Sequence, residues 1–287
     1  MAVIEAIVLG TLLGLVYATL SVGFSLTWGT LDVIHVSHGA FVIFGAYLGY
    51  TAHASYGIDP VLALVAIVPL FFVIGVALYE LLFRPLADRA REVAFASMVL
   101  SFGLAIAVEN LLVVQFSADP RVLQTGYTRD VVNVLGVPVT TGRLVGAGLA
   151  LLTLVIVFVF LKYTYTGRAV LAVAQNAEGA ALSGIDERRV SAITFGLGLA
   201  TAAIAGVATA MFWSFTPSEH LHWMVFVFIV TILGGVGSVV GAGVAGLLTG
   251  LVYELSALVV PFAWVDFVLF VLLVCLLVVK PEGLFQQ

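Results

Sequence analysis

The sequence predicts an all-α membrane protein that crosses the bilayer about nine times. Hydrophobic residues make up 62% of the 287-residue chain and charged residues only 9%, against roughly 25% charged residues in an ordinary soluble domain. Apolar runs of about 20 residues, the length that a helix needs to cross the hydrocarbon core, recur along the whole chain. We therefore treat residues 1–287 as a single transmembrane domain.

Polar, turn-like breaks divide the chain into its predicted crossings. The breaks include YGIDP at 56–60, FRPLADRARE at 83–92 and Lys280-Pro281 near the end. The one long interval, 117–142, is too polar and too rich in proline and glycine to be embedded in lipid. The predicted crossings lie near residues 4–28, 34–52, 60–83, 93–116, 143–162, 190–213, 222–235, 238–258 and 262–280.

The distribution of Lys and Arg predicts the orientation. If nine crossings alternate, the basic residues at 84–91, those at 162–189 and Lys280 all fall on the same side of the membrane. Cytoplasmic loops carry an excess of Lys and Arg, so this side is predicted to be the cytoplasm. The N-terminus is then outside and the C-terminus cytoplasmic, with Arg121, Arg129 and Arg143 as exceptions on the outer side. The basic residues of the cytoplasmic side are Arg84, Arg89, Arg91, Lys162, Arg168, Arg188, Arg189 and Lys280.

The order of the crossings also predicts an inverted repeat. If the fifth crossing is a linker, the first four and the last four begin on opposite sides, as in many transporters. The second crossing, which contains VIHVSHG at 33–39, then corresponds to the seventh, a short segment that ends in LGGVGS. Short or glycine-broken helices at matching positions indicate a transport pathway. We therefore expect one short or re-entrant helix.

The histidines of VIHVSHG raise the question of a metal site. His35 and His38 are three residues apart and would share a helix face, with Asp32 one turn before them. Three ligands at this spacing on one helix do not converge on one ion, so no metal site is predicted. Two roles remain open, because the histidines either line a pathway or form hydrogen bonds with neighbouring helices. Ser37 and Ser238 are placed to cap helices that begin at breaks in the membrane.

The segment 165–185 has the pattern of a short amphipathic helix. Apolar residues recur at helical spacing in TGRAVLAVAQNAEGAALSGI, and Gly184 is a helix stop. Such a helix can dock into a groove on another protein, or it can lie among lipid headgroups, which favours several basic residues. Because Arg168 is the segment's one basic residue, docking is the favoured interpretation.

Several ordered motifs resemble the permease subunits of branched-chain amino acid ABC importers. GRAVLAVAQNAEGAALSGI, followed by Asp186 and Arg189-Val190, is similar to the cytoplasmic loop of that family. The stretch GLVYATLSVGFSLTWGTLDVIHVSHGAFVIFGAYLGY resembles its N-terminal pattern, and LGGVGSVVGAGVAGLLTGL its glycine-rich late segment. FRPL at 83–86 and KPEGLF at 280–285 also match. The resemblance therefore covers nearly the whole chain.

The resemblance implies partners and a mechanism. Segment 165–185 would be the coupling helix, which is displaced when the ATPase subunits close on ATP. The transported substrate would be a branched-chain or other hydrophobic amino acid. Urea, short amides and small aromatic or organic acids remain alternatives. The partners would be two ATP-binding cassette subunits, a second permease subunit and a periplasmic solute-binding protein. A related permease chain, forming a heterodimer, is favoured over a second copy, forming a homodimer. The chain would sit in the bacterial inner membrane and bind no cofactor itself, with ATP on the partner subunits.

The same resemblance implies roles for individual residues. Three of them depart from the family pattern: the family more often has Asn at the position of His35, Ala at that of Ser37 and an amide at that of Glu109. These departures leave the substrate open. His220 and His222 are expected in an outer loop, solvated or docking the binding protein. The residues predicted to line the translocation pathway are His35, Ser37, His38, Gly39, Glu109, Asn110, Gly234, Gly235, Gly237 and Ser238. Those predicted to couple to the ATPase are Gly167, Arg168, Ala174, Gln175, Asn176, Glu178 and Gly184.

Other function classes fit the sequence less well. GGVGS lacks the Lys-Ser/Thr pair of a Walker A motif, so any ATPase must be a separate chain. A secondary transporter would explain the repeat but not the amphipathic segment. An intramembrane hydrolase using Ser37 is disfavoured, because His35 and His38 are too close along one helix to serve as its base, so no enzyme is predicted. The 11 Lys and Arg are scattered, which argues against nucleic-acid binding.

Overall fold

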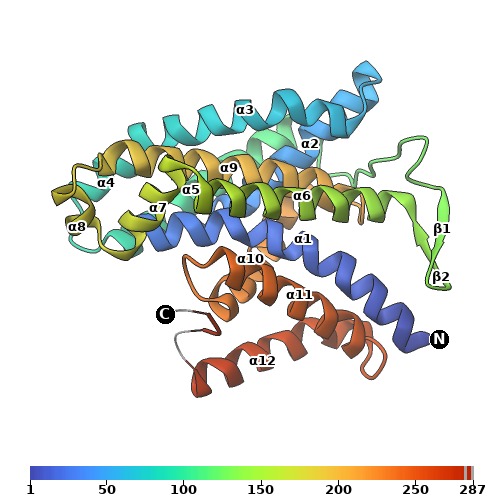
Figure 1. Ribbon diagram of the computed structural model, residues 1–287. Coiled ribbons are helices and arrows are strands. Elements are labelled where there is room, and N and C mark those ends of the chain that lie inside the picture. Colours follow the sequence, from blue (N-terminus) through green and yellow to red (C-terminus); the bar gives the residue numbers. More distant parts are fainter. Residues whose placement is uncertain (281–282, 286–287) are drawn as a thin grey trace.

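Long helices dominate the computed structural model, which describes residues 1–280 and 283–285 (Figure 1). Within this part of the chain, eight helical spans are long and apolar enough to cross a membrane. The second predicted crossing, at 34–52, also forms a 19-residue helix, but its histidines, glycines and tyrosines make it too polar to count among those eight. Pro281 and Glu282 of the KPEGLF motif lie outside the described residues.

The long helices are α1 (Ala2–Leu31), α2 (His38–Tyr56), α3 (Pro60–Leu78), α5 (Val93–Phe116), α6 (Thr141–Tyr163), α9 (Glu187–Ala210), α10 (His220–Gly234), α11 (Val239–Ser256) and α12 (Val265–Val279). The short elements are a π-helical turn (Tyr79–Phe83), α4 (Arg84–Ala87), α7 (Tyr165–Gln175), α8 (Ala177–Leu182) and two 3₁₀ turns (Pro217–Glu219 and Phe262–Trp264).

A small β-hairpin interrupts the otherwise helical fold. β1 (Val131–Val134) pairs antiparallel with β2 (Val137–Thr140) in the interval that the sequence predicts to be a loop. Leu135 and Gly136 connect the strands with positive φ angles of 53° and 84°, the conformation of a tight hairpin turn. Leu is a poor signal for such a turn, which explains why the prediction omits the hairpin.

The centre of the bundle is the crossing of α1 with α9. A Cβ atom on Gly23 of α1 would lie 2.7 Å from the carbonyl oxygen of Gly198 on α9, so the two backbones touch. Small residues permit this approach, which drives helix association in lipid. On its other side α1 packs along α11, while α9 packs along α3, where Gly75 meets Gly196. The main hydrophobic core is built chiefly from α1, α2, α9 and α10, with α3 packed against it, whereas α11 adds only Ala245.

These pairings fit the predicted inverted repeat. In that repeat α1 corresponds to α9 and α3 corresponds to α11. The contact of α1 with α11 then has its counterpart in the contact of α9 with α3, and both are present. The shorter helices α2 and α10, which follow α1 and α9, also touch each other.

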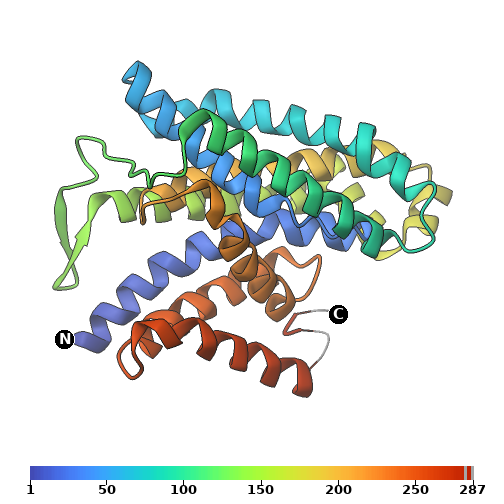
Figure 2. The same ribbon diagram turned by 180° about the vertical axis from the view of Figure 1, so that it is seen from behind.

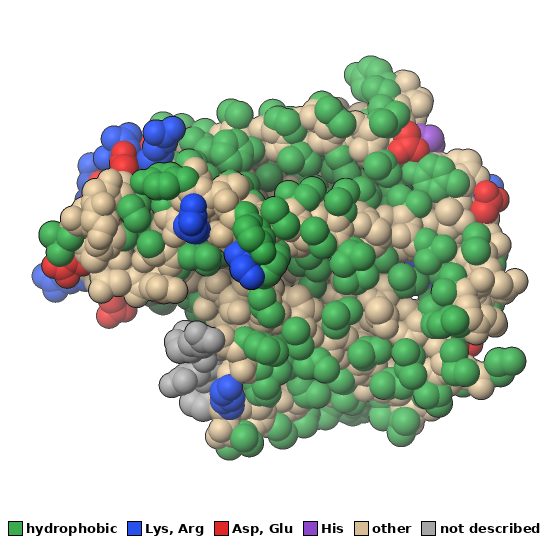
Figure 3. Space-filling model, viewed as in Figure 1, with side chains coloured by type: hydrophobic (Ala, Val, Ile, Leu, Met, Phe, Trp, Pro, Cys, Tyr) green, Lys and Arg blue, Asp and Glu red, His purple; other side chains and the backbone are tan. Residues whose placement is uncertain are grey.

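The two ends of the bundle differ in charge. The N-terminus and the β-hairpin lie at one end, whereas α4, α7 and α8 lie at the other, as both views show (Figure 1 and Figure 2). Lys and Arg side chains gather over the end that carries α4, α7 and α8 (Figure 3). The basic sites before α5 and around α7 thus share one end of the molecule, as the sequence predicts.

The packing of α1 on α11 yields a stability prediction. We expect Gly246→Val to lower the melting temperature sharply, because its Cβ would lie 2.5 to 2.6 Å from backbone and side-chain atoms of Ala18. Overpacking of this kind costs about 1–3 kcal/mol or more. Gly243→Val on the same helix is the matched control, since no atom lies within 4 Å of that Cβ position. Thermal unfolding of both variants in detergent, followed by tryptophan fluorescence, tests the prediction, and equal melting temperatures would contradict it.

Candidate translocation and coupling sites

The second predicted crossing begins with an irregular segment rather than a helix. α1 ends at Leu31, Asp32 adopts a left-handed conformation with φ 53°, and residues 33–37 are not helical before α2 begins at His38. The expectation that His35 and His38 share a helix face is therefore wrong. The segment does not leave the bundle, because His35 is fully buried.

Two serines of α5 hold this segment in its irregular conformation. The backbone N–H groups of Ile34 and Val36 donate to Ser97 Oγ at 3.0 Å and Ser101 Oγ at 2.9 Å. Ser101 Oγ in turn donates to the carbonyl oxygen of Ile34 at 3.1 Å. Non-helical backbone at membrane depth is tolerated only where such partners exist. These bonds replace the helical ones and are the physical reason why α2 starts late.

The two buried histidines have different surroundings. His38 Nε2 lies 2.9 Å from the carbonyl oxygen of Leu20 on α1, so Nε2 carries the proton and donates it across helices. His35 instead packs among aromatic rings, with ring centroids 4.7 Å from Phe195 and 5.4 Å from Phe83. The predicted cross-helix hydrogen bond is thus present for His38, while within the described structure the ring nitrogens of His35 have no partner.

Only one of the two predicted serine caps forms. Ser238 Oγ accepts a hydrogen bond from the Gly241 N–H at 2.9 Å and caps α11, as predicted. Ser37 occupies the N-cap position of α2, but its side chain makes no capping bond. The predicted cap is wrong for Ser37 because this turn residue has right-handed dihedral angles, φ −68° and ψ −3°, whereas a capping side chain needs extended backbone.

The helices α2 and α10 begin against each other inside the bundle. A Cβ on Gly39 would collide with the carbonyl oxygen of His220, the first residue of α10, so this contact requires glycine. His220 is buried, with 2% of its surface exposed, and the expectation of a solvated outer loop is wrong for it. His222 remains exposed. The contact with Gly39, which the sequence does not reveal, draws His220 inward.

α5 brings an acidic and an amide side chain to this region. Glu109 Oε2 lies 3.6 Å from His220 Nδ1, and a quarter of the Glu109 side chain is exposed. Asn110 is exposed, and its Nδ2 donates to the carbonyl oxygen of Ile106 at 2.8 Å. The structure therefore groups Glu109 with His220 and Gly39, while Asn110 faces outward from the bundle.

The glycine-rich stretch packs on the end of α1 that leads into residues 33–37. Gly235 and Gly237 adopt φ angles of 92° and 83°, which favour glycine. The Gly237 N–H donates to Ser25 Oγ at 3.0 Å, and the backbone of Gly237 touches Gly29. Gly234 lies against Gly241 at the start of α11. Gly234, Gly235, Gly237 and Ser238 thus form one turn between α10 and α11.

The predicted coupling helix is two helices. α7 ends at Gln175, and Asn176 leaves the helical conformation with φ −161° and ψ 98°. Asn176 Oδ1 then accepts a hydrogen bond from the Gly179 N–H at 2.8 Å and caps α8. The prediction of a single helix over 165–185 is therefore wrong, because Asn176 ends α7 and acts as the N-cap of α8 in the middle of that segment. Gly184, with φ 83°, follows the end of α8 as the predicted helix stop.

The coupling residues divide into buried anchors and an exposed face. Gly167 is buried where α7 folds back against Phe160 of α6, a contact that a Cβ would prevent. Ala174 lines a cleft of about 620 Å³ together with Asp32 and Glu187. The remaining predicted residues are exposed, namely Arg168, Gln175, Asn176, Glu178 and Gly184.

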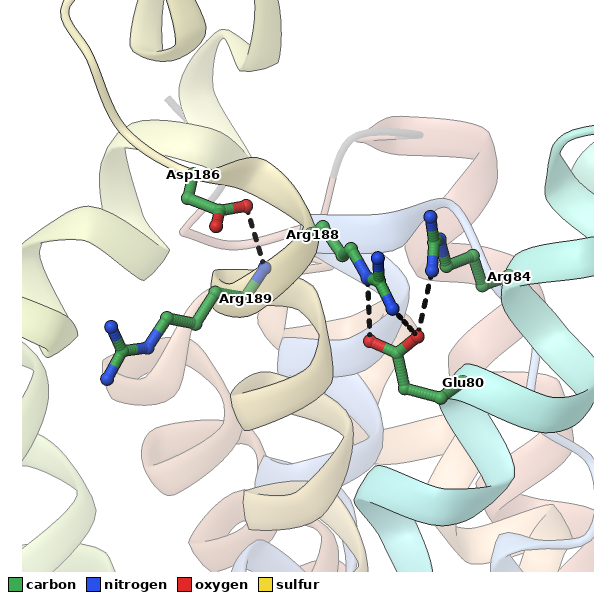
Figure 4. Close-up of polar contacts among 5 residues, drawn as sticks. All are labelled: Glu80, Arg84, Asp186, Arg188 and Arg189. Carbon is green, nitrogen blue, oxygen red and sulfur yellow. Dashed lines mark hydrogen bonds and ion pairs between the residues drawn. The ribbon is translucent and has the colours of Figure 1, made fainter.

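An acidic residue outside the predicted sites joins two helices at this end (Figure 4). Glu80 Oε2 accepts from Arg84 at 2.9 Å and from Arg188 at 2.7 Å, and Glu80 Oε1 accepts from Arg188 Nε at 3.1 Å. Beside it, Asp186 accepts from the backbone N–H of Arg189 and caps α9. The pair with Arg84 is readable from its i,i+4 spacing, but the pair with Arg188 is not.

No cluster of metal ligands occurs among the residues that the structure describes, where three or more His, Cys, Asp or Glu side chains nowhere gather to hold an ion.

Comparisons with known proteins agree with the predicted resemblance. The family model "Branched-chain amino acid transport system / permease component" matches residues 6–277. The chain is 28% identical to the high-affinity branched-chain amino acid transport system permease protein LivH of Escherichia coli K12, over 96% of this chain and 92% of LivH. It is 26% identical to BraD of Pseudomonas aeruginosa, over 98% of this chain and 95% of BraD. No solved structure matches. The chain therefore belongs to the family of branched-chain amino acid ABC transporter permeases, whose members are membrane subunits and not themselves enzymes.

Proposed function

We propose that this chain is the permease of an ATP-driven importer that moves a branched-chain or other hydrophobic amino acid into a bacterial cytoplasm. The match to the family over residues 6–277 and the names of LivH and BraD support the substrate class. The observation that carries the proposal is the α7–α8 segment, which presents an exposed polar face at one end of a membrane bundle. A transporter that works without ATP would leave this exposed face unexplained.

Two ATP-binding cassette subunits would dock on α7 and α8. Leu182 at the end of α8 has 85% of its surface exposed, and Gln175 and Glu178 are exposed beside it. An apolar anchor within a polar rim is typical of a protein-binding surface. Because α7 is anchored on α6 through Gly167 and α8 leads into α9, a push on this surface would reach both helices.

The basic end would face the cytoplasm, which places the N-terminus and the β-hairpin outside. The excess of Lys and Arg around α4 and α7 supports this orientation. A periplasmic binding protein would then deliver substrate at the end that carries the hairpin, and the protein would be a multi-pass component of the inner membrane.

The pathway would run past the residues around the α2 and α10 helix starts. The proposed lining is His35, Ser37, His38, Gly39, Glu109, Gly234, Gly235, Gly237 and Ser238. Asn110 drops out of the predicted set, because it faces outward from the bundle. The N-terminal ends of α2 and α10 supply partial positive charge that would favour the carboxylate of an amino acid. Glu109 would favour its ammonium group.

An uptake assay tests the proposed function. We expect membrane vesicles that contain this chain and its co-purifying subunits to accumulate labelled isoleucine only with ATP. Leucine and valine should compete, whereas urea and benzoate should not. Uptake that survives ATP depletion but collapses with the ion gradient would instead identify a secondary transporter, and competition by urea would move the substrate to short amides.

Alanine substitution tests the coupling surface. We expect Arg168→Ala combined with Gln175→Ala to reduce the amount of ATPase that co-purifies with the chain by about fivefold or more, the effect of losing more than 1 kcal/mol of interface energy. Arg91→Ala is the matched control. Like Arg168, Arg91 is basic and exposed, but it lies in the loop between α4 and α5, outside α7. Equal ATPase recovery from both variants would exclude α7 from the docking surface.

His38 allows structural and transport roles to be separated. We expect His38→Leu to lose about 0.5–1.5 kcal/mol of stability, because the donor to Leu20 is gone. His38→Gln keeps a donor and should melt close to the wild type. If His38 also lines the pathway, isoleucine uptake by His38→Gln vesicles should fall while the melting temperature stays. Wild-type uptake by this variant would remove His38 from the pathway.

A further inference from the structure

A polar cleft at the basic end of the bundle leads toward the irregular segment 33–37. The cleft has a volume of about 620 Å³ and lies between the end of α1, the π-helical turn, α7 and α9. Asp32, Glu187 and Ser191 form part of its wall, so water rather than lipid fills it. Phe83, which is fully buried, belongs to the same wall.

Three aromatic side chains pack together where this cleft meets the interior of the bundle. The ring centroids of Phe83 and Phe195 are 4.7 Å apart. His35 packs against both rings, at centroid distances of 5.4 Å and 4.7 Å. Glu187, Ser191 and Phe195 follow one another at spacings of four residues, so they share one face of α9. The wall of the cleft on α9 therefore leads directly to the three rings.

His35 is an unusual member of such a ring cluster. It is fully buried, and within the described residues neither of its ring nitrogens has a hydrogen-bond partner. A buried polar group without a partner costs free energy, so a purely structural cluster would favour a third apolar ring. If the rings separated, water from the cleft would reach His35 and remove that cost. His38, whose ring centroid lies 6.0 Å from that of His35, continues the path to the start of α2.

We propose that Phe83, Phe195 and His35 form the cytoplasmic gate of the translocation pathway, and that the polar cleft is its exit vestibule. This inference rests on the proposed function and adds Phe83 and Phe195 to the pathway. In this structure the gate is closed, because all three side chains are fully buried. The transported amino acid would leave past these rings into the water of the cleft.

The ion pair of Figure 4 joins the same two elements that carry the gate. Phe83 ends the π-helical turn that contains Glu80, and Phe195 lies about two turns along α9 from Arg188. Arg188 Nη2 lies 2.7 Å from Glu80 Oε2, so the pair holds together the elements whose rings must separate. π-helical turns are frequent at functional sites. Because α8 leads into α9, a push on α8 would act on this pair first.

Cysteine accessibility in inside-out membrane vesicles tests the proposal. In a chain with Cys275→Ser and Ser37→Cys, a charged, membrane-impermeant methanethiosulfonate should label position 37 slowly, because Ser37 is fully buried. We expect Phe83→Ala to raise this labelling rate about tenfold or more, since a buried Phe ring contributes more packing free energy than a tenfold change requires. Thr19→Cys is the matched control, because Thr19 is equally buried but lies against Ala150 of α6. Its labelling rate should stay low.

Three results would overturn the gate. The first is an unchanged labelling rate at position 37 in Phe83→Ala. The second is an equal rise at position 19, which would indicate loosened packing of the whole bundle. The third is faster labelling of position 37 in right-side-out vesicles than in inside-out vesicles, which would place the opening on the other side of the membrane.

The ion pair supplies a variant that keeps all three rings. Arg188→Gln removes the contact between the two elements, and we expect it to raise the labelling rate of Ser37→Cys about twofold to fivefold, the range for a partly exposed ion pair. Arg84→Gln is the matched control, because Arg84 pairs with Glu80 at i,i+4 spacing and does not reach α9. Equal labelling rates in the two variants would overturn the proposal. Labelling needs no transport, so a failed isoleucine assay would count against the proposed function and leave the gate to be judged by these rates.

Discussion

The direct contact of α1 and α9 at Gly23 and Gly198 is the constraint on which the fold depends. In lipid no hydrophobic gain drives helices together, so close backbone packing must supply the attraction. Close backbone packing at glycines also occurs where α1 meets α11 and where α9 meets α3. These long helices form a frame in which the shorter ones take their places.

That frame makes room for two helices that begin inside the bundle. α2 is preceded by non-helical chain and α10 by the 3₁₀ turn Pro217–Glu219, and Gly39 lets the starts of α2 and α10 touch. Irregular backbone at this depth needs hydrogen-bond partners, which Ser97 and Ser101 supply beside α2. Polar groups without charge therefore accumulate near the middle of an otherwise apolar molecule.

The basic end of the bundle is tied to this middle by an ion pair and by a close backbone contact. At the basic end, Glu80 joins α9 to the π-helical turn, and α7 is held against α6. The start of α9 is therefore held to the end of α3 directly beside the segment that would meet the ATPase. A displacement of α7 and α8 would thus move α6 and α9 rather than bend a free loop. α9 would transmit that displacement to Gly198, where it contacts α1 at Gly23.

The sequence by itself determined the membrane class, the crossings and the family, because hydrophobic length and ordered motifs are local properties of the chain. It also located the amphipathic segment that forms α7 and α8, and the cap at Ser238. Only the tertiary structure decided that α2 starts at His38, since Ser97 and Ser101 lie some 60 residues away in the chain. It likewise decided that His220 is buried and that Arg188 pairs with Glu80. These features depend on contacts between distant segments, which periodicity and composition do not encode.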